Sequence, residues 1–295
     1  MTSLKTPLRY PGGKSRAVKK MAEFFPLFDG YKEFREPFIG GGSVALYITQ
    51  MYPKLDIWVN DLYEPLYNFW RELQENGNEI KNILLQLKQR HPDPTSAKYL
   101  FLEAKEYLTK PLRQTTTKDR AVSFYIVNKC SFSGLTESSS FSRQASDSNF
   151  SLRGIEKLPY YQQLIGNWKI TNMSYEELMT DDKGVFVYLD PPYEIKSNLY
   201  GKRGNMHKGF DHDEFFFTCD RYVCDQMVSY NSSNLIKSRF IDWTPYEYDH
   251  TYTMRSVGEY MQEQQSRKEL LLLNLSLIHI SEPTRRRESR MPSSA

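Results

Sequence analysis

Stretches of apolar residues in this chain follow two spacings, and each spacing predicts a different kind of element. Residues 184–189 form an apolar run, rich in β-branched and aromatic side chains and opened by a glycine, which predicts a buried strand. Shorter stretches predict further strands at residues 34–39, 56–61, 168–172, 227–231, 240–248 and 268–275. Elsewhere apolar residues recur every three or four positions, which is typical of helices that bury one face.

Helical spacing accounts for most of the remaining pattern. It is present after residue 14, at residues 43–48 and over 211–228. From about residue 65 to residue 129 it continues across several helices, interrupted at the prolines of residues 91–94. A helix-rich block inside a pattern of alternating strands and helices indicates an inserted subdomain. We therefore predict an α/β fold, with a mostly parallel sheet, helices on both of its faces and a helical insert.

The last twenty residues have a different character. Residues 276–295 have no periodicity and no core positions, and they hold a run of arginines at 285–287. Such a run is typical of a basic tail that binds nucleic acid. It also resembles the translation of a sequencing-adapter read-through at the end of an assembled gene. We expect this tail to be non-native or disordered.

Composition narrows the class of protein without naming a partner. The chain has a net charge of +3, of which the last twenty residues contribute +2, so any nucleic-acid footprint must be a local patch. Three cysteines without metal-ligand spacing suit a reducing cytoplasm better than a disulfide framework. No apolar run is long enough to span a bilayer and no secretory signal pattern is seen, so we expect a cytoplasmic protein with no membrane partner. We expect no metal site, since His207 and His212 lack a completing acid or cysteine.

The strand at 184–189 ends in Asp190-Pro191-Pro192-Tyr193, which combines a carboxylate, a stiff turn and an aromatic ring. In open α/β sheets, ligands bind at the carboxyl ends of the strands. The exocyclic amine of adenine or cytosine is a weak nucleophile, because its lone pair is shared with the ring. The Asp190 carboxylate and the Pro191 carbonyl would accept its N–H groups and localise that lone pair, while Tyr193 offers a face for stacking. The alternative is a plain strand-to-loop turn with a capping aspartate.

A strand, a glycine turn and a helix follow one another at residues 34–48, with Gly40-Gly41-Gly42 at the turn, as in nucleotide-cofactor sites. A Rossmann dinucleotide site is the alternative, although position 45 holds Ala where that pattern has Gly.

Asp61 ends the next strand about twenty residues further on, where an acid accepts ribose hydroxyls; the alternative is a helix N-cap. Lys14 lies at the wrong end of its helix for the helix dipole, which indicates a ligand carboxylate or, alternatively, a solvated side chain.

With residues 8–14 (Leu-Arg-Tyr-Pro-Gly-Gly-Lys) and 35–43, the Asp-Pro-Pro-Tyr motif makes the chain similar to the Dam-type, D12 class DNA adenine-N6 methyltransferases over roughly residues 4–275. The resemblance implies a Rossmann-like sheet that uses S-adenosylmethionine, in the motif order of the family's α group. It implies four parts: the cofactor-binding part of the catalytic domain (1–64), an inserted target-recognition subdomain (65–158), the Asp-Pro-Pro-Tyr part of the catalytic domain (159–275) and the tail (276–295).

The resemblance also implies roles for individual residues. Asp190, Pro191, Pro192 and Tyr193 would orient and stack on a base flipped out of the duplex. Asp61 would hold the cofactor's ribose, and the glycine loop would cup its methionine part. The strand end at 168–172 would lie beside the cofactor's adenine, although this chain has no acid there. The residues expected to bind S-adenosylmethionine are Tyr10, Lys14, Glu36, Pro37, Phe38, Gly40, Gly42, Asp61 and Asp190.

Residues 131–151 are polar and rich in serine, which predicts an exposed loop. Its scattered aromatics and arginines also suit contact with DNA, and residues 128–134 resemble the segment that leads into the family's target-recognition region. A glycine- and lysine-rich loop at 197–210 follows the catalytic turn. DNA contacts are expected at Lys129, Arg143, Asn149, Arg153, Lys202 and Arg203, each with a plain surface residue as the alternative.

The resemblance thus predicts transfer of a methyl group to adenine N6 in double-stranded DNA by a monomer, with any cognate restriction endonuclease acting separately. One alternative is cytosine N4 methylation, which uses the same amine chemistry but usually has Ser at the first position of the motif. Another is a non-catalytic DNA-binding relic of the same fold. RNA or protein-glutamine methylation is disfavoured, because those enzymes often carry Asn in place of Asp190.

Overall fold

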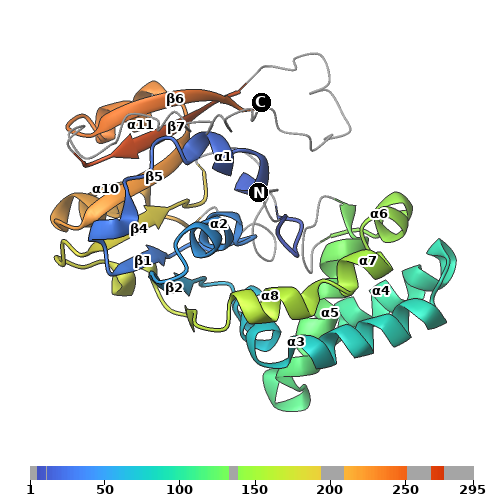
Figure 1. Ribbon diagram of the computed structural model, residues 1–295. Helices are drawn as coiled ribbons and strands as arrows, with labels where there is room; N and C mark the ends of the chain where they lie inside the picture. Colours follow the sequence, from blue (N-terminus) through green and yellow to red (C-terminus); the bar gives the residue numbers. More distant parts are fainter. Residues whose placement is uncertain (1–4, 11, 133–138, 194–208, 251–266, 276–295) are drawn as a thin grey trace, which may run out of the picture.

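Seven strands form one sheet in the order β3-β2-β1-β4-β5-β7-β6 (Figure 1). The computed structural model describes residues 5–10, 12–132, 139–193, 209–250 and 267–275. The strands are β1 Glu33–Glu36, β2 Asp56–Asn60, β3 Lys169–Thr171, β4 Val185–Leu189, β5 Asp225–Asn231, β6 Thr244–His250 and β7 Arg267–Leu273. β7 is antiparallel to β5 and β6, and the other paired strands are parallel. The prediction of an α/β fold with a mostly parallel sheet is therefore confirmed.

Helices surround this sheet. The α-helices are α1 Val18–Met21, α2 Ser43–Met51, α3 Glu64–Arg90, α4 Pro94–Thr109, α5 Thr117–Cys130, α6 Arg143–Ser148, α7 Leu152–Ile155, α8 Leu158–Leu164, α10 His212–Arg221 and α11 Asn234–Arg239. Short 3-10 helices are η1 Lys14–Arg16, η2 Phe28–Gly30, η3 Leu112–Gln114 and η5 Tyr175–Leu178. Within the described part of the chain, no helix has the length and apolar character needed to cross a membrane.

The central strand β4 is buried on both faces, as its unbroken apolar run predicts. Phe186 and Tyr188 belong to a core cluster that includes side chains of α1 and α2. Val185, Val187 and Leu189 point the other way, into a second cluster with side chains of α10 and α11. Helices therefore cover both faces, and the carboxyl end of β4 opens toward the loops that follow the parallel strands.

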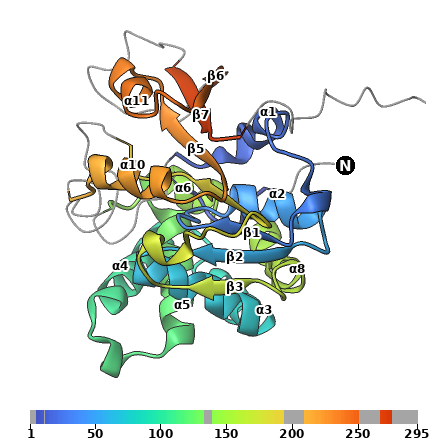
Figure 2. The same ribbon diagram turned by 90° about the vertical axis from the view of Figure 1, so that its left-hand side faces the viewer.

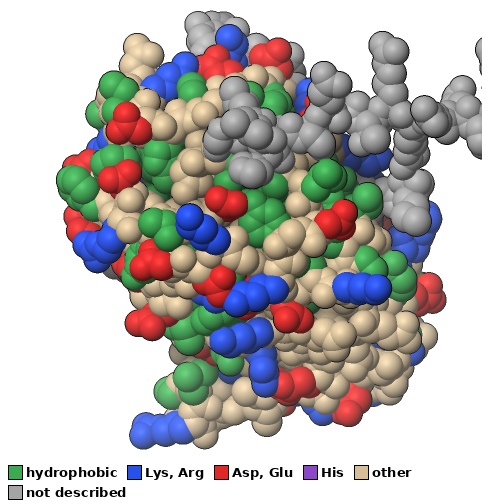
Figure 3. All heavy atoms as spheres, turned by 60° about the vertical axis from the view of Figure 1, so that its left-hand side comes forward, with side chains coloured by type: hydrophobic (Ala, Val, Ile, Leu, Met, Phe, Trp, Pro, Cys, Tyr) green, Lys and Arg blue, Asp and Glu red, His purple; other side chains and the backbone are tan. Residues whose placement is uncertain are grey.

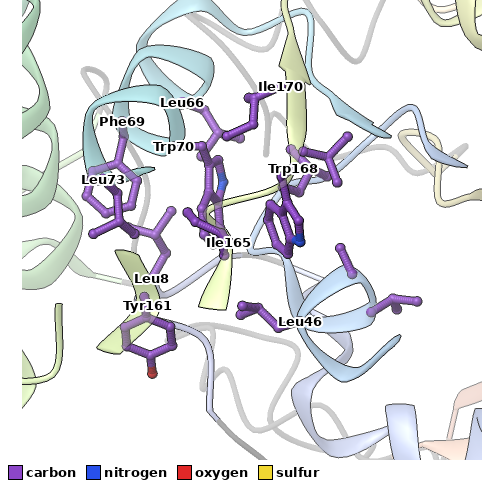
Figure 4. Close-up of a cluster of buried hydrophobic side chains, with 14 of the residues drawn as sticks. Leu8, Leu46, Leu66, Phe69, Trp70, Leu73, Tyr161, Ile165, Trp168 and Ile170 are labelled. Carbon is purple, nitrogen blue, oxygen red and sulfur yellow. The ribbon is translucent and has the colours of Figure 1, made fainter. Parts of the chain in front are cut away.

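Helices α3 to α8 group on the side of the sheet where β2 and β3 lie (Figures 1 and 2). Their apolar side chains share one cluster with the sheet rather than forming a core of their own. Figure 4 shows this junction, where Trp70 of α3 packs against Trp168 just before β3, with 5.7 Å between the ring centroids. Leu8 and Leu46 from the N-terminal part of the chain join the same cluster. The helical block is thus firmly attached to the strands that carry the glycine turn and Asp61.

Two expectations about the C-terminal half were wrong. The helix expected over 211–228 ends at Arg221, because the side chain of Gln226 donates hydrogen bonds to the carbonyl oxygens of Cys219 and Tyr222 at the helix end. The strand expected from residue 240 begins at Thr244, after the unforeseen helix α11. Periodicity does not reveal the side-chain contacts that end α10.

The expectation of an exposed loop at 131–151 was wrong for part of its described residues. Ser131, Ser139 and Ser146 are buried, as is Phe150. Two other serines cap helices: the Ser142 side chain accepts a hydrogen bond from the N–H of Ala145 at the start of α6, and the Ser151 side chain accepts one from Gly154 at the start of α7. A serine-rich composition here reflects short capped helices.

The glycine turn gives a direct test of this packing. Gly42 precedes α2 with φ +70°, and a Cβ there would lie 2.6 Å from a ring carbon of the fully buried Trp70. Left-handed strain costs about 1–2 kcal/mol, and overpacking adds a similar amount. Gly42→Ala should therefore lower the free energy of unfolding by about 2–4 kcal/mol in urea titrations followed by circular dichroism. Gly30→Ala is the matched control, since no described atom lies within 4 Å of the place that its added methyl group would take; equal stability of the two variants would contradict the packing described.

Candidate active site

Lys14 is the buried centre of the site. It begins η1, and only 3% of its side chain is exposed. Its ammonium nitrogen lies 2.8 and 2.9 Å from the two carboxylate oxygens of Asp190, 2.7 Å from the Tyr193 hydroxyl and 3.3 Å from the Gly12 carbonyl oxygen. An ammonium group has three N–H donors, so these protein groups use all of them. The carboxylate that the position of Lys14 led us to expect is thus Asp190 of the chain itself.

Asp190 lies directly after β4, at the carboxyl edge of the sheet. One fifth of its side chain is exposed, although Lys14 is almost completely buried. Burial raises the pKa of Asp190 above its ordinary value, and the charge and hydrogen bond of Lys14 oppose that rise. The ion pair therefore favours the ionised form of Asp190, although burial still leaves its pKa above the ordinary value. A carboxylate has acceptor positions beyond those that Lys14 occupies, and they remain for a ligand.

Tyr193 is anchored through its hydroxyl group. The hydroxyl donates to Glu269 Oε2 at 2.7 Å and accepts from Lys14, and Ser229 Oγ lies 3.2 Å away. Its ring is stacked on Tyr230, with 5.7 Å between centroids and 30° between planes. Tyr230 thus covers one face of the Tyr193 ring. The stacking on a base that the sequence predicts would use the opposite face.

Two aromatic rings of the protein, Tyr10 and Trp70, pack against the glycine turn at residues 40–42. A Cβ at Gly40, where φ is +48°, would lie 3.0 Å from the Tyr10 ring, and a Cβ at Gly42 would meet Trp70. The indole N–H of Trp70 also donates to the Gly40 carbonyl at 3.2 Å. We expected these glycines to let a ligand approach closely, but the chain's own aromatic side chains already require them.

Asp61 links the glycine turn to the end of β2. Its two carboxylate oxygens accept from the backbone N–H of Gly40 at 3.1 Å and of Tyr63 at 3.0 Å. Burial raises the pKa of Asp61 to about 6, although both hydrogen bonds oppose the rise. None of the ion pairs found among the described residues involves Asp61. This buried acid therefore keeps lone pairs for hydroxyl donors of a ligand.

The other expected cofactor residues on β1 and after it have partners within the protein. Glu36 is buried and accepts from the backbone N–H of Ala45 at 2.8 Å, so it caps the N-terminus of α2, and burial raises its pKa well above the usual value. The Pro37 carbonyl accepts from the Asn60 side chain at 3.1 Å. Phe38 is stacked on Tyr175 with 5.4 Å between ring centroids. These contacts shape the edge of the sheet where Asp61 and Asp190 lie.

Two polar residues near the site were missed by the sequence reasoning. Asn60 at the end of β2 donates to the carbonyls of Pro37 and Met173 and accepts from the N–H of Met173, so it connects the ends of β1, β2 and β3. Glu269 on β7 is buried beside Lys14 and Tyr193. The sequence does contain a signal for each of them. Glu269 is a single acid directly before four leucines, and Asn60 is an amide directly before Asp61.

The expected DNA contacts have different surroundings. Arg143 and Arg153 are on α6 and α7 at the surface, whereas the Asn149 side chain lies near the Ala145 carbonyl, 3.3 Å away.

Lys129 is 9% exposed, and burial together with the nearby Arg9 lowers its pKa to about 7, which does not favour a surface contact with phosphate. Lys202 and Arg203 lie outside the described residues. On the face shown in Figure 3, lysines and arginines are interspersed with acidic side chains.

The family model for D12 class N6 adenine-specific DNA methyltransferases matches residues 10–254 of this chain. The chain belongs to this family. The match covers the Lys14 segment, the glycine turn, Asp61 and the Asp-Pro-Pro-Tyr motif, and so includes both halves of the site. The chain is therefore an adenine-specific DNA methyltransferase, and the resemblance noted from its motifs is confirmed.

Two named relatives are type II methyltransferases, in line with the family match. The type II methyltransferase M1.LlaDCHI of Lactococcus lactis subsp. cremoris is 24% identical over 259 residues, covering 83% of this chain and 87% of the relative. The type II methyltransferase M.MjaIII of Methanocaldococcus jannaschii is 24% identical over 202 residues, covering 63% and 68%. Among solved structures, the rRNA methyltransferase aviRa from Streptomyces viridochromogenes aligns over 90% of this chain and 85% of its own, with 11% identity and a TM-score of 0.30.

The raised pKa of Asp61 predicts pH-dependent cofactor binding. Hydroxyl donors bind the ionised carboxylate, so affinity should be lost as the pH falls through about 6. At pH 5, S-adenosylmethionine should bind roughly tenfold more weakly than at pH 8 by titration calorimetry. Asp61→Asn should weaken binding and remove this pH dependence. Asp56→Asn, at the exposed opposite end of β2, is the control and should behave as the unchanged chain. An affinity that is constant from pH 5 to pH 8 would exclude this role for Asp61.

Proposed function

We propose that this methyltransferase transfers a methyl group from S-adenosylmethionine to N6 of an adenine that is flipped out of double-stranded DNA at a specific site. The observation that carries the proposal is the Lys14–Asp190 ion pair, which fixes a carboxylate at the carboxyl end of the central strand. Residues from the N-terminal motif and from the Asp-Pro-Pro-Tyr motif meet there, as a reaction between a cofactor and a base requires.

The side chains present fit S-adenosylmethionine. Asp61 is a buried carboxylate that accepts hydrogen bonds from two backbone N–H groups and keeps further lone pairs, which suits ribose hydroxyls. Two acids, Asp190 and Glu269, lie beside the single ammonium of Lys14. The three side chains together therefore carry an excess of negative charge, which suits a positively charged sulfonium. When bound, S-adenosylmethionine supplies a methyl carbon that its sulfonium charge activates. Asp61, Asp190 and the glycine turn are the residues that would hold it.

Asp190 and Pro191 act on the amine. The carboxylate accepts one N–H of the target amine and the Pro191 carbonyl accepts the other, which draws the lone pair out of conjugation with the ring. Tyr193 offers the face opposite Tyr230 to the base. An amine inside the base stack cannot meet the cofactor, so the base must leave the duplex. Positioning of two reactants in this way lowers a barrier by up to about 7–11 kcal/mol, and a fixed charge adds to it.

The relatives bear on the biological role. Both named relatives are type II methyltransferases, which supports a role in restriction–modification, with any endonuclease acting as a separate protein. We propose a monomer as the active form. Arg143 and Arg153 are the candidates for contact with the DNA backbone, from two neighbouring short helices.

The test is transfer from labelled S-adenosylmethionine to unmethylated DNA, followed by nucleoside analysis of the digest. The unchanged chain should give N6-methyladenine. Asp190→Ala should lower the transfer rate by about 10²–10⁴-fold, because the amine loses its charged acceptor. Asp182→Ala is the matched control: Asp182 precedes the opposite end of β4, is 42% exposed, and should leave the rate unchanged.

Each other outcome has a defined meaning. N4-methylcytosine in the digest would keep the amine chemistry and overturn the substrate. Full transfer by Asp190→Ala would refute the proposed role of the carboxylate. Cofactor binding by the unchanged chain, without transfer to any DNA that contains all possible short sites, would contradict the proposed function.

A further inference from the structure

Glu269 is a buried acid that enters the proposed reaction only through its negative charge. It lies near the start of β7, opposite Asn231 of β5 and Tyr248 of β6, and only 1% of its side chain is exposed. Leu271 and Leu273 share its face of the strand and pack into the core. An ionisable side chain is almost never buried so fully unless partners hold it. Its partners therefore explain its presence among leucines.

Two of those partners, Tyr193 and Lys14, also contact Asp190. Glu269 Oε2 accepts the Tyr193 hydroxyl at 2.7 Å and lies 3.8 Å from the Lys14 nitrogen. The Tyr193 hydroxyl accepts from Lys14 at 2.7 Å and also hydrogen-bonds with the Asp190 carboxylate, so it lies between Glu269, Lys14 and Asp190. The result is a continuous chain of contacts, Glu269–Tyr193–Lys14–Asp190, which joins β7 to η1 and to the turn after β4.

We propose that Glu269 is a positioning residue for methyl transfer: by holding the Tyr193 hydroxyl and sharing the Lys14 ammonium, it sets the geometry and the charge of the Asp190 carboxylate. The inference rests on the proposed function, since it concerns the same transfer step. Glu269 acts at a distance from the reacting atoms, through Tyr193 and Lys14.

The charge of Glu269 also affects the pKa of Asp190. Asp190 is surrounded by Lys14 from η1, Glu36 from β1, Tyr188 from β4, Tyr248 from β6 and Glu269 from β7. The negative charge of Glu269 raises the pKa of Asp190, against the lowering effect of Lys14. Loss of that charge, with the shape kept, should therefore let Asp190 ionise at lower pH. A role in core packing alone would leave the pH dependence unchanged.

The test compares Glu269→Gln with the unchanged full-length chain in single-turnover and steady-state methyl transfer. Gln keeps an acceptor for Tyr193 but removes the charge shared with Lys14. We expect kcat to fall about tenfold or more, with KM for DNA and the S-adenosylmethionine affinity changed less than about threefold. The acid limb of the kcat–pH profile should shift to lower pH by on the order of half a unit. Glu269→Asp should recover part of kcat and return the acid limb toward its original position.

The matched control is Glu247→Gln on the neighbouring strand β6. Glu247 is a partly exposed glutamate that pairs with Lys237 and Lys268, and its substitution should leave kcat and the pH profile unchanged. Tyr193→Phe provides a second route should Glu269→Gln fold poorly, since it removes the same contact from the other side. It should also lower kcat, and the combination with Glu269→Gln should cost little more than the larger single loss.

The outcomes separate this inference from the proposed function. Absence of transfer by the unchanged chain would count against the proposed function. Normal transfer by the unchanged chain, together with a Glu269→Gln protein whose kcat and acid limb are unaltered, would overturn the role of Glu269 alone. A fully additive effect of Tyr193→Phe and Glu269→Gln would also overturn it, because the two residues would then act independently.

Discussion

A lysine side chain that is only 3% exposed needs a counter-charge for its ammonium, and the rest of the site depends on that requirement. Lys14 meets it with Asp190, which joins the N-terminal segment to the end of the central strand. The same segment is tied to α5, because the Asn128 side chain accepts from the Arg9 N–H at 2.9 Å and donates to the Arg9 carbonyl at 2.6 Å. One short stretch of chain therefore connects the Asp190 turn, through Lys14, to the helical block. A change in either neighbour would be transmitted to Asp190.

Much of the fold could be predicted because its signals are local. The apolar run of β4 and the strand–glycine–helix order at β1 and α2 each depend on neighbouring residues alone, and both are present in the structure. The end of α10 and the burial of the serines around α6 could not be predicted in that way. Each depends on contacts made across the chain, such as the Gln226 side chain that caps α10. A serine that caps a buried helix has the same composition as a serine in an exposed loop.

The residues of the site also divide into those that local sequence signals single out and those that depend on contacts made across the chain. Spacing was enough to single out Asp61 and Asp190, since both follow strands whose carboxyl ends meet at one edge of the sheet. The partner of Lys14 could not be deduced, because 176 residues separate it from Asp190. Glu269 was missed for a related reason: its significance comes from the Tyr193 hydroxyl and the Lys14 ammonium, which only the folded chain brings to it. The burial of Lys129, which was expected to contact DNA, likewise could not be predicted from the sequence.

The most direct measurement is a double-mutant cycle on Lys14 and Asp190, with unfolding in urea of the unchanged chain, Lys14→Met, Asp190→Asn and the double variant. Each single change leaves a charged group in a largely buried site without its partner, whereas the double change leaves neither. The losses in unfolding free energy should therefore be non-additive, with the double variant less destabilised than the sum of the singles by about 1–3 kcal/mol. Additive losses would mean that the pair does not hold the two halves of the site together, and the central role assigned to Lys14 would be wrong.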